Sequence, residues 1–446
     1  METTRMTRRS AAARLDRLPI TSYHRYVVWI LGFVFFSELA CINTFSFAAP
    51  AILKQWHISI AMVGYLVSAT FLGMFLGAVS GGWFSDRVGR KRALILTTVW
   101  FSLFSLLNSV VWEPTGLFIA RLLTGVGLSA MTVVGITYVS EMFPAKKRGA
   151  YQGWIMTVGL VGIPATAYVA RFSIPIAPWG WRLVFVWGGL GLIFAALMAM
   201  KFEESPRWYE NRGLLAEADA VMDRIETRAR AEFGDLPPVP ESAPVATRRG
   251  GYGEFFAPAY LPRTIMLLVT WIAQTLGFYG FMAWVPTLLV AHGVSIVHSL
   301  AWSSAISIGA VPGALIAALI AERWERKWSI SGTTLVIAFC GLMYGLTFKT
   351  AAIIIFGFCV AMFTQTFVSL IYAYTAECYP TEIRNSGTGL TYGVGRLANV
   401  FGPLIVASLY TSFGYTSVFV FIAAMWLVVA VTIGIFGPLT KGRTLA

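Results

Sequence analysis

The chain has 446 residues, of which 57% are hydrophobic and 12% are charged, and its mean hydropathy is +0.70. Soluble domains carry roughly 25% charged residues, so this composition excludes an ordinary water-soluble domain. The net charge of +13 does not call for a nucleic-acid partner, because the basic residues gather in short loops between long apolar runs.

Twelve apolar runs follow one another along the chain, and each is long enough to cross about 30 Å of hydrocarbon as a helix. We therefore expect an all-α membrane protein with twelve transmembrane helices. The first six expected spans are Val27–Pro50, Ala61–Phe84, Ala93–Val111, Thr115–Ser140, Ala150–Phe172 and Trp181–Met200. The remaining six are Thr264–Val290, His298–Ala321, Ser329–Phe348, Ala351–Ala376, Asn385–Tyr410 and Thr416–Gly437.

The polar segments divide these spans into two groups of six. We expect an N-terminal tail over 1–26, a six-helix bundle over 27–200, a linker over 201–263, a second six-helix bundle over 264–437 and a tail over 438–446. Within the linker, residues 214–233 are rich in Ala, Glu and Arg and predict an amphipathic helix. The prolines that follow between 237 and 244 predict disordered chain that joins the halves.

Lys and Arg are distributed unequally between the two faces of this layout. The tails, the linker and the loops on their side of the membrane hold 28 of the 34 basic residues, and the opposite face holds four. Because cytoplasmic loops carry the excess of Lys and Arg, both termini and the linker are expected in the cytoplasm.

Two sequence motifs recur at one fixed offset. The segment Gly82 to Lys91 follows the second span, and a related segment around Glu322 follows the eighth. Glu141-Met-Phe-Pro follows the fourth span, and Glu377-Cys-Tyr-Pro follows the tenth. Both pairs are 236 residues apart, so the two bundles are expected to be copies of one six-span unit.

The segment from Gly82 to Lys91 resembles the loop signature of the major facilitator superfamily, and the resemblance extends over the whole chain. It implies two pseudo-symmetric six-helix bundles. An acid at the end of one helix can accept hydrogen bonds from arginines, while a glycine permits a tight turn, so the motif can act as a conformational latch; a basic loop that only sets topology is the alternative. The expected gating residues are Asp86, Arg87, Gly89, Arg90, Glu141, Arg148, Glu322, Arg323, Arg326, Glu377 and Arg384.

Further segments are similar to the sugar-porter and organic-ion branch of that superfamily. They include Arg121 before Glu141, and Glu204-Ser-Pro-Arg-Trp after span six. Sugar porters carry paired glutamines in span seven, whereas this chain has only Gln274, followed by Thr275. The segments 278–280 and 284–288 instead resemble transporters of aromatic and other organic acids, including nicotinate permeases. The C-terminal segment has Leu439 where sugar porters have Glu, which puts one gate contact in doubt.

Three ionisable residues, Glu38, Arg121 and Arg396, fall well inside expected spans. Each costs roughly 2.5–3.5 kcal/mol at the centre of a lipid-facing helix, so all three should face a cavity or one another. Glu38 is the candidate proton carrier, because desolvation favours its neutral form and a nearby arginine its charged form. The resemblance to proton-coupled sugar porters implies that it pairs with Arg121. A structural ion pair that never titrates is the alternative.

Arg396 lies about 17 Å into span eleven and is the candidate clamp for an anion, since a guanidinium matches a carboxylate with two parallel donors. The alternative is that it braces span eleven by bonding a carbonyl or an acid. Gln274 occupies the repeat position of Glu38 and can only form hydrogen bonds. Further candidates for the substrate site are aromatic residues that could stack on a planar ligand, with plain packing as the alternative for each: Phe45, Tyr138, Tyr279, Trp284, Tyr372 and Tyr392.

These patterns favour a secondary transporter in a bacterial inner membrane that takes up a small organic anion with protons, by alternating access between the bundles. Its expected partners are the substrate, protons and the bilayer, and a monomer without cofactors, metals or enzymatic activity is expected. The alternatives are a proton-coupled sugar symporter, an exporter of drugs or metabolites, and a nutrient sensor that does not transport. The four cysteines show no disulfide or metal pattern.

Overall fold

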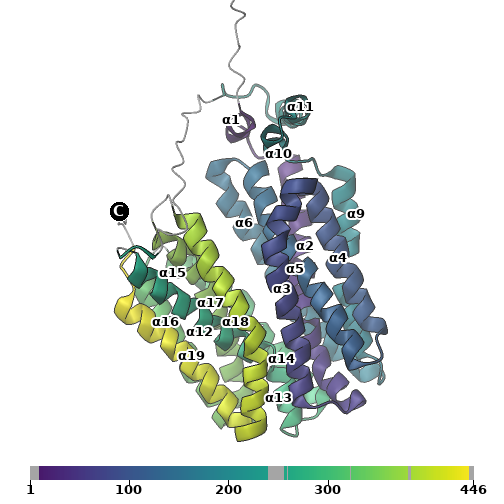
Figure 1. Ribbon diagram of the computed structural model, residues 1–446, viewed down its shortest axis with the longest axis vertical. Coiled ribbons are helices and arrows are strands. Elements are labelled where there is room, and N and C mark those ends of the chain that lie inside the picture. Colours follow the sequence, from purple (N-terminus) through teal and green to yellow (C-terminus); the bar gives the residue numbers. More distant parts are fainter. Residues whose placement is uncertain (1–9, 240–255, 259, 322, 380–382, 441–446) are drawn as a thin grey trace, which may run out of the picture.

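A computed structural model describes residues 10–239, 256–258, 260–321, 323–379 and 383–440, without the side chains of Ala318, Ala321, Arg384, Asn385 and Ser386. Within these ranges every regular element is a helix, and twelve helices or helix pairs are long and apolar enough to cross a membrane. Figure 1 shows them as two bundles, blue to purple for the first half of the chain and green to yellow for the second. The expected all-α fold with twelve transmembrane helices is confirmed.

The first bundle contains four unbroken spans and two spans that are each made of two helices. The unbroken spans are α2 (Ser22–Trp56), α3 (Ile60–Val88), α4 (Arg90–Val110) and α5 (Pro114–Met142). The fifth span joins α6 (Ala145–Leu160) to α7 (Gly162–Ser173) and the short helix η1 (Ile174–Ile176). The sixth joins α8 (Trp181–Gly188) to α9 (Gly191–Lys201).

The second bundle also has four unbroken spans and two broken ones, but here the first two spans are broken. These spans are α12 (Leu261–Met282) with α13 (Val285–Ala291), and α14 (Ile296–Ser307) with α15 (Ala310–Ala321). The remaining four are α16 (Arg326–Leu346), α17 (Thr350–Glu377), α18 (Arg384–Phe413) and α19 (Tyr415–Phe436). The break in the seventh span, at 283–284, was not expected from its apolar run. Pro286 lies in the first turn of α13. Proline is tolerated there because the first N–H groups of a helix have no intrahelical acceptor, and its fixed φ favours the start of a new helix.

Helix α2 begins five residues earlier than its apolar run, at Ser22. Its start is set by a capping box, in which the Thr21 side chain accepts from the His24 backbone N–H while the His24 ring bonds the Thr21 backbone N–H. Two donors that the first turn leaves without intrahelical partners are thereby satisfied.

The tightest packing within the first bundle joins α3 to α5. A Cβ added to Gly73 or Gly77 of α3 would collide with the backbone of α5, and one added to Gly125 of α5 would collide with the backbone of α3. Small residues at such crossings let two helix backbones approach closely inside a bilayer. Through this contact α5, which carries Arg121, is fixed against α3.

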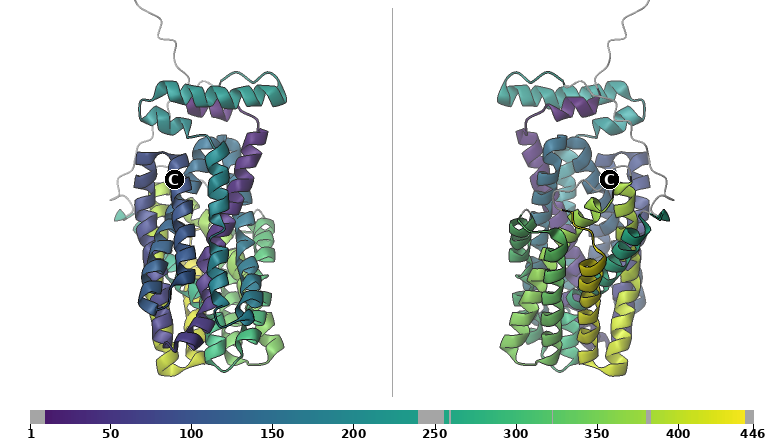
Figure 2. Two further views of the ribbon diagram at one scale, coloured as in Figure 1. Left: turned by 90° about the vertical axis from the view of Figure 1, so that its right-hand side faces the viewer. Right: turned by 90° about the vertical axis from the view of Figure 1, so that its left-hand side faces the viewer.

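Three further helices lie over one end of the first bundle. They are α1 (Ala11–Asp16), α10 (Pro206–Asn211) and α11 (Leu215–Phe233), and the views in Figure 2 show α11 lying across this end. We call it the linker end of the molecule, and the opposite end the far end. The amphipathic helix expected at 214–233 is therefore present, whereas the proline-rich chain expected beyond it includes 240–255, outside the described residues.

Ion pairs hold α1 to α11. Arg14 bonds Glu226 at 2.8 Å, Asp219 at 3.2 Å and Asp223 at 2.6 Å, and Arg17 bonds the second oxygen of Glu226 at 2.9 Å. Burial alone would raise the pKa of Glu226, but the hydrogen bonds and charges of the two arginines outweigh it, so this pKa lies below its ordinary value.

We expect docking of α1 to be lost when the charge of Glu226 is removed. A lowered pKa in the folded state gives stability that is present above the ordinary carboxyl pKa of about 4.3 and is lost as the pH falls through the lowered value. In Glu226→Gln, hydrogen exchange of the α1 amides, taken relative to their intrinsic rate, should be severalfold faster at neutral pH. The wild type should show this only when the pH falls below the ordinary carboxyl pKa. Glu217→Gln, an exposed acid of the same helix, is the matched control; equal protection in both variants would contradict the expectation.

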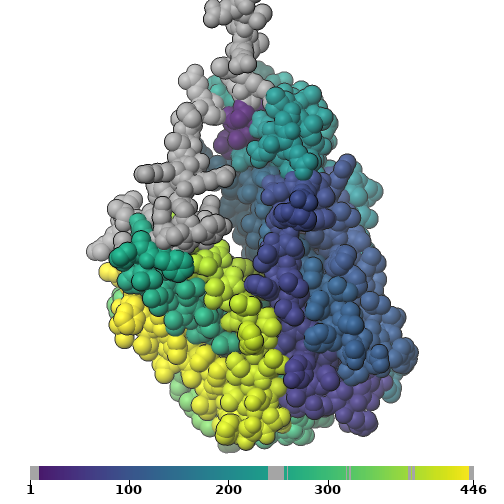
Figure 3. Space-filling model, viewed as in Figure 1, coloured from purple at the N-terminus to yellow at the C-terminus, as the bar shows by residue number. Residues whose placement is uncertain are grey.

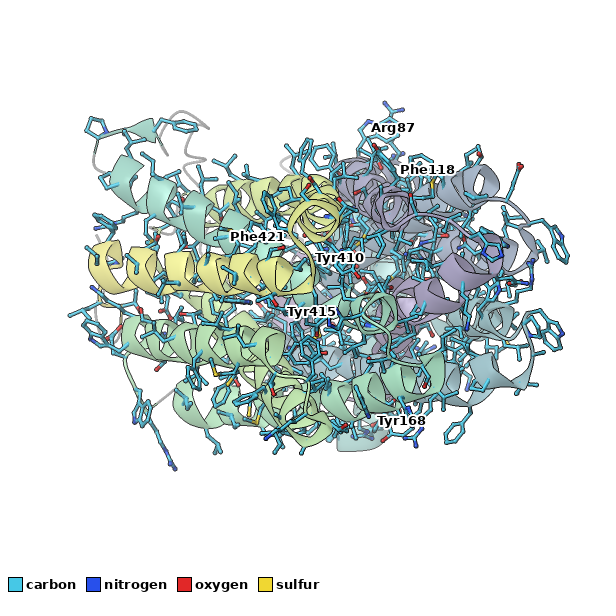
Figure 4. The ribbon with its side chains drawn as sticks, turned by 90° about the horizontal axis from the view of Figure 1, so that it is seen from below. Arg87, Phe118, Tyr168, Tyr410, Tyr415 and Phe421 are labelled. Carbon is cyan, nitrogen blue, oxygen red and sulfur yellow. The ribbon has the colours of Figure 1, made fainter. Side chains whose placement is uncertain are left out.

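The two bundles meet at the far end and diverge toward the linker end (Figure 1). At the far end α18 packs on α3, α13 on α2, and α14 on α7. The Ser304 hydroxyl donates to the Ala167 carbonyl across this junction at 3.2 Å. Figure 4 looks onto the far end, where α18, with Tyr410, lies beside the N-terminal bundle. Figure 3 shows the surface hollowed between the bundles toward the linker end.

Candidate functional site

Arg396 lies on α18 in the space between the bundles, surrounded by aromatic side chains. Its guanidinium donates to the Tyr392 hydroxyl one turn earlier, from Nε at 2.8 Å and also from Nη2, and more weakly to the Tyr279 hydroxyl of α12 at 3.4 Å. Tyr392 in turn contacts Trp271 and Tyr372, with ring centroids 5.3 and 5.8 Å apart. We call this group, Arg396 with Tyr279, Tyr392, Tyr372 and Trp271, the arginine–tyrosine cluster.

The hydrogen-bond partners of Arg396 in this cluster are hydroxyl groups, not a carboxylate. Among the described residues, no carboxylate forms an ion pair with it, although the structure brings Glu38 of α2 close enough for the two charges to act on each other. A half-buried guanidinium held by neutral phenols can bind the carboxylate of a ligand, to which it can donate two parallel hydrogen bonds. Arg396, Tyr279, Tyr392 and Tyr372 are thus brought together as the sequence predicted.

Glu38 is buried, with 5% of its surface exposed, and one of its oxygens accepts a hydrogen bond from the Thr132 hydroxyl of α5 at 3.0 Å. The Leu128 carbonyl of the same helix, also 3.0 Å from the Thr132 hydroxyl, is the alternative acceptor and the usual partner of a threonine in a membrane helix. For this reason the contact of Thr132 with Glu38 could not be predicted from the sequence. Because a carboxyl oxygen can accept this hydrogen bond in both the neutral and the charged form, Glu38 can gain or lose a proton and keep its contact with Thr132.

The expected pair of Glu38 with Arg121 is not formed. Arg121 and Thr132 stand eleven residues apart on α5, which is about 16 Å along the helix axis, and Glu38 lies at the level of Thr132. The guanidinium of Arg121 instead lies over the Phe45 ring, 4.9 Å from its centroid. The charge facing Glu38 comes from Arg396, on the other bundle.

Arg121 lines a second feature, a pocket of about 70 Å³ between the bundles, which we call the outer pocket. Helices of both bundles form its walls, and its polar lining residues are Asn43, Ser46, Thr70, Arg121, Ser307 and Gln365. Phe45 and Tyr279, both predicted for the substrate site, line it as well. The rings of Tyr279 and Phe71 touch edge to face with centroids 4.7 Å apart, so this pair joins the bundles between the outer pocket and the arginine–tyrosine cluster.

Three further residues predicted for the substrate site are Tyr138, Trp284 and Gln274, the last on α12 between Trp271 and Tyr279. Tyr138 is fully buried at the linker end, stacked on Phe202 at 5.3 Å, and its hydroxyl donates to the Glu203 carbonyl at 2.8 Å. Trp284 is fully buried in the break between α12 and α13. Gln274 is buried and donates to the neighbouring Thr275 hydroxyl at 2.6 Å. None of the three lines the outer pocket.

The signature loop between α3 and α4 forms the predicted charge cluster at the linker end. Arg90 is buried and bonds Asp86 at 2.6 Å and both oxygens of Glu141 at 3.1 and 3.2 Å. Gly89 has φ +101°, and any side chain there would collide with Glu204, whose carboxylate accepts from the Lys91 backbone N–H. The cluster ties α3, α4 and α5 to the start of the linker. Arg87 is exposed against Trp83, and Arg148 donates only a long bond to the Ser140 carbonyl at 3.4 Å.

The second copy of this cluster keeps its central pair. Arg326 bonds Glu377, and both residues stand 236 positions after Arg90 and Glu141. Glu325, where the first copy has Gly89, accepts from the Thr440 backbone N–H at 2.9 Å and so holds the C-terminal segment. Arg323 is exposed, and Glu322 and the side chain of Arg384 lie outside the described residues.

Comparisons with known proteins agree with this architecture. Residues 26–446 match the family model described as "Sugar (and other) transporter". The chain is 44% identical to a putative metabolite transport protein of Bacillus subtilis, over 97% of this chain and 96% of that protein. It is 30% identical to a niacin transporter of Acinetobacter baylyi, over 97% and 98%. The crystal structure of a D-xylose-proton symporter superimposes with a TM-score of 0.74 at 18% identity, over 95% of this chain and 100% of that chain.

Proposed function

The chain belongs to the sugar (and other) transporter family of the major facilitator superfamily, and on this basis we propose that it takes up a small organic anion together with protons. The observation that carries the proposal is Arg396, a guanidinium between the bundles that is held by tyrosine hydroxyls and lacks a carboxylate partner among the described residues. The protein is an integral membrane transporter, and a bacterial inner membrane with both termini in the cytoplasm fits the distribution of its basic residues.

The walls around Arg396 favour an aromatic or other planar monocarboxylate. Tyr392, Tyr372 and Trp271 offer ring faces and edges next to the guanidinium, so a ligand can place its carboxylate on Arg396 and its ring among these side chains. A relative with 30% identity is a niacin transporter, and niacin is an aromatic carboxylic acid. A sugar would need several hydrogen-bonding groups, and the one glutamine of span seven, Gln274, already bonds Thr275.

Glu38 supplies a route to proton coupling. Its carboxylate and the substrate's carboxylate both act on Arg396, so protonation of Glu38 removes a competing negative charge and strengthens binding of the anion. Release of the proton on the other side of the membrane weakens binding again. Proton and anion therefore bind cooperatively, which is the requirement for symport.

The shape of the molecule fits alternating access. The far end is closed by α3 against α18 and by α7 against α14, while the bundles diverge toward the linker end (Figure 1). With the linker in the cytoplasm, this arrangement is the inward-facing state. Rocking of the bundles about the Phe71–Tyr279 contact would open the far end and close the linker end.

A thermal-shift screen of the purified protein tests the substrate class. The panel contains benzoate, nicotinate, 4-hydroxybenzoate, succinate, glucose, xylose and tetraethylammonium, because a compound that binds the folded protein raises its melting temperature. At a concentration about 100 times the Kd, binding adds about 2.7 kcal/mol of stability. We expect only carboxylates to raise the melting temperature, and aromatic ones most. A shift by the sugars or by the cation, without one by any acid, would contradict the proposal.

A further inference from the structure

The outer pocket contains a set of buried donors that the proposed binding at Arg396 does not use. Within the described part of the chain, Nε and Nη1 of Arg121 are buried and have no hydrogen-bond partner, and the hydroxyl of Thr70 is likewise buried without one. Arg121 has only 2% of its surface exposed, and both residues line the outer pocket. Buried donors without partners carry a desolvation cost, which is larger when the donor is charged and which a ligand that accepts their hydrogen bonds would offset.

The charge of this pocket is positive and uncompensated. Among the polar residues that line it there is no Asp or Glu, and the Asn43 amide nitrogen is already committed to the Leu39 carbonyl at 2.7 Å. The Phe45 ring offers its face to one side of the Arg121 guanidinium, at 4.9 Å, and leaves the edge with its N–H groups available. A planar guanidinium edge beside a hydroxyl donor suits a carboxylate or a halide.

An anion that enters from the far end would reach the outer pocket before it reaches Arg396. Arg121 lies seven residues, about 10 Å, from the start of α5 at the far end. The Phe71–Tyr279 pair stands next, and the Tyr279 hydroxyl contacts Arg396. The volume of about 70 Å³ is room for about five water molecules at roughly 10–15 Å³ each, and therefore for a halide or a small carboxylate.

We propose that the outer pocket is a second anion subsite, in which Arg121 and Thr70 hold a carboxylate or halide before Arg396 binds the substrate. This inference rests on the proposed function for the path of the anion, but not for the binding itself. It assigns Arg121 to anion binding rather than to a pair with Glu38. Tyr279 contacts Arg396 and lines the outer pocket with Arg121. It would therefore separate the two sites that the anion occupies in turn.

Equilibrium binding to the full-length protein in lipid nanodiscs tests the subsite. Melting temperatures are recorded against sodium benzoate and, separately, sodium chloride, with ionic strength kept constant by the sodium salt of a bulky sulfonate. If a carboxylate occupies the subsite, Arg121→Gln should raise the half-saturating benzoate concentration at least tenfold, Thr70→Val should raise it less, and Arg121→Lys should recover part of the loss. Arg171→Gln, an exposed arginine at the far end, should behave as the wild type.

The chloride titration separates the two sources of the anion. If a halide occupies the subsite, chloride should stabilise the wild type and Arg396→Gln alike, and this effect should disappear in Arg121→Gln. A benzoate effect that depends on Arg396 alone, with no chloride effect through Arg121, would overturn the subsite, as would the absence of any anion effect in the wild type. Failure of the proposed transport would appear instead as wild-type protein that binds an anion at Arg121 but moves no acid across a membrane.

Discussion

Replacing Arg396 with Ala is expected to weaken binding of the organic acid at least 100-fold, or about 2.7 kcal/mol at 1.36 kcal/mol per tenfold change. The reason is that two charge-assisted hydrogen bonds to the carboxylate disappear together. Arg396→Lys should recover only part of the affinity, because a point charge replaces a two-pronged donor. The measurement is the half-saturating concentration in thermal-shift or radioligand binding, with expression and chromatographic behaviour recorded in parallel.

Tyr392→Phe is the matched control for this substitution. It removes the hydroxyl that accepts from Nε and Nη2 of Arg396 but leaves the guanidinium in place. If Arg396 acts by bracing α18 through Tyr392, both variants should lower the melting temperature of the empty protein to a similar degree. If Arg396 binds the anion, Tyr392→Phe should keep most of the affinity. Unchanged affinity in Arg396→Ala would remove the main reason for an anionic substrate.

Replacing Glu38 with Gln is expected to separate binding from proton coupling. The side-chain oxygen of Gln can still accept from Thr132, so the geometry at 3.0 Å is retained while the group can no longer gain or lose a proton. The variant should bind the acid and exchange it across proteoliposome membranes, because exchange moves no net protons. Accumulation driven by a pH gradient should disappear.

The pH dependence of binding gives this prediction its sign. In the wild type, apparent affinity for the anion should rise as the pH falls from about 8 to 5, because protonation of Glu38 removes a negative charge that acts on Arg396. The Glu38→Gln variant should show the high affinity of the protonated state throughout this range. Glu113→Gln, an exposed acid at the far end, is the control and should keep the wild-type dependence. If Glu38→Gln still accumulates the acid under a pH gradient alone, the proton is carried elsewhere.

The sequence predicted the membrane fold because its signals are local and repeated. Each span is a long apolar run, and the structure places a helix or helix pair at each. The family resemblance drawn from Gly82 to Lys91 is confirmed by the family match over 26–446. The structure also shows a contact that matches the 236-residue repeat, since Arg90–Glu141 and Arg326–Glu377 form equivalent ion pairs in the two bundles.

The partners of the buried charges could not be predicted in the same way. Whether Glu38 faces Arg121 or Arg396 depends on the depth of each residue along its helix and on how the bundles are placed, and neither property is local. The apolar pattern also gave no reason to expect that Tyr138 would bond the Glu203 carbonyl at the linker end. The docking of α1 on α11 was missed because it depends on Arg14 meeting acids more than 200 residues away.

The central claim, uptake of an organic anion with protons, is tested most directly in proteoliposomes that contain only this protein. The vesicles are loaded at pH 8 and diluted into medium at pH 6 with radiolabelled nicotinate, and protein-free vesicles correct for passive movement of the neutral acid. We predict protein-dependent accumulation above the passive level, loss of that accumulation with a protonophore, and acidification of the vesicle interior that rises with nicotinate concentration. Uptake that reaches the same level with and without the pH gradient, or no protein-dependent uptake of nicotinate or any other carboxylate of the panel, would contradict the claim.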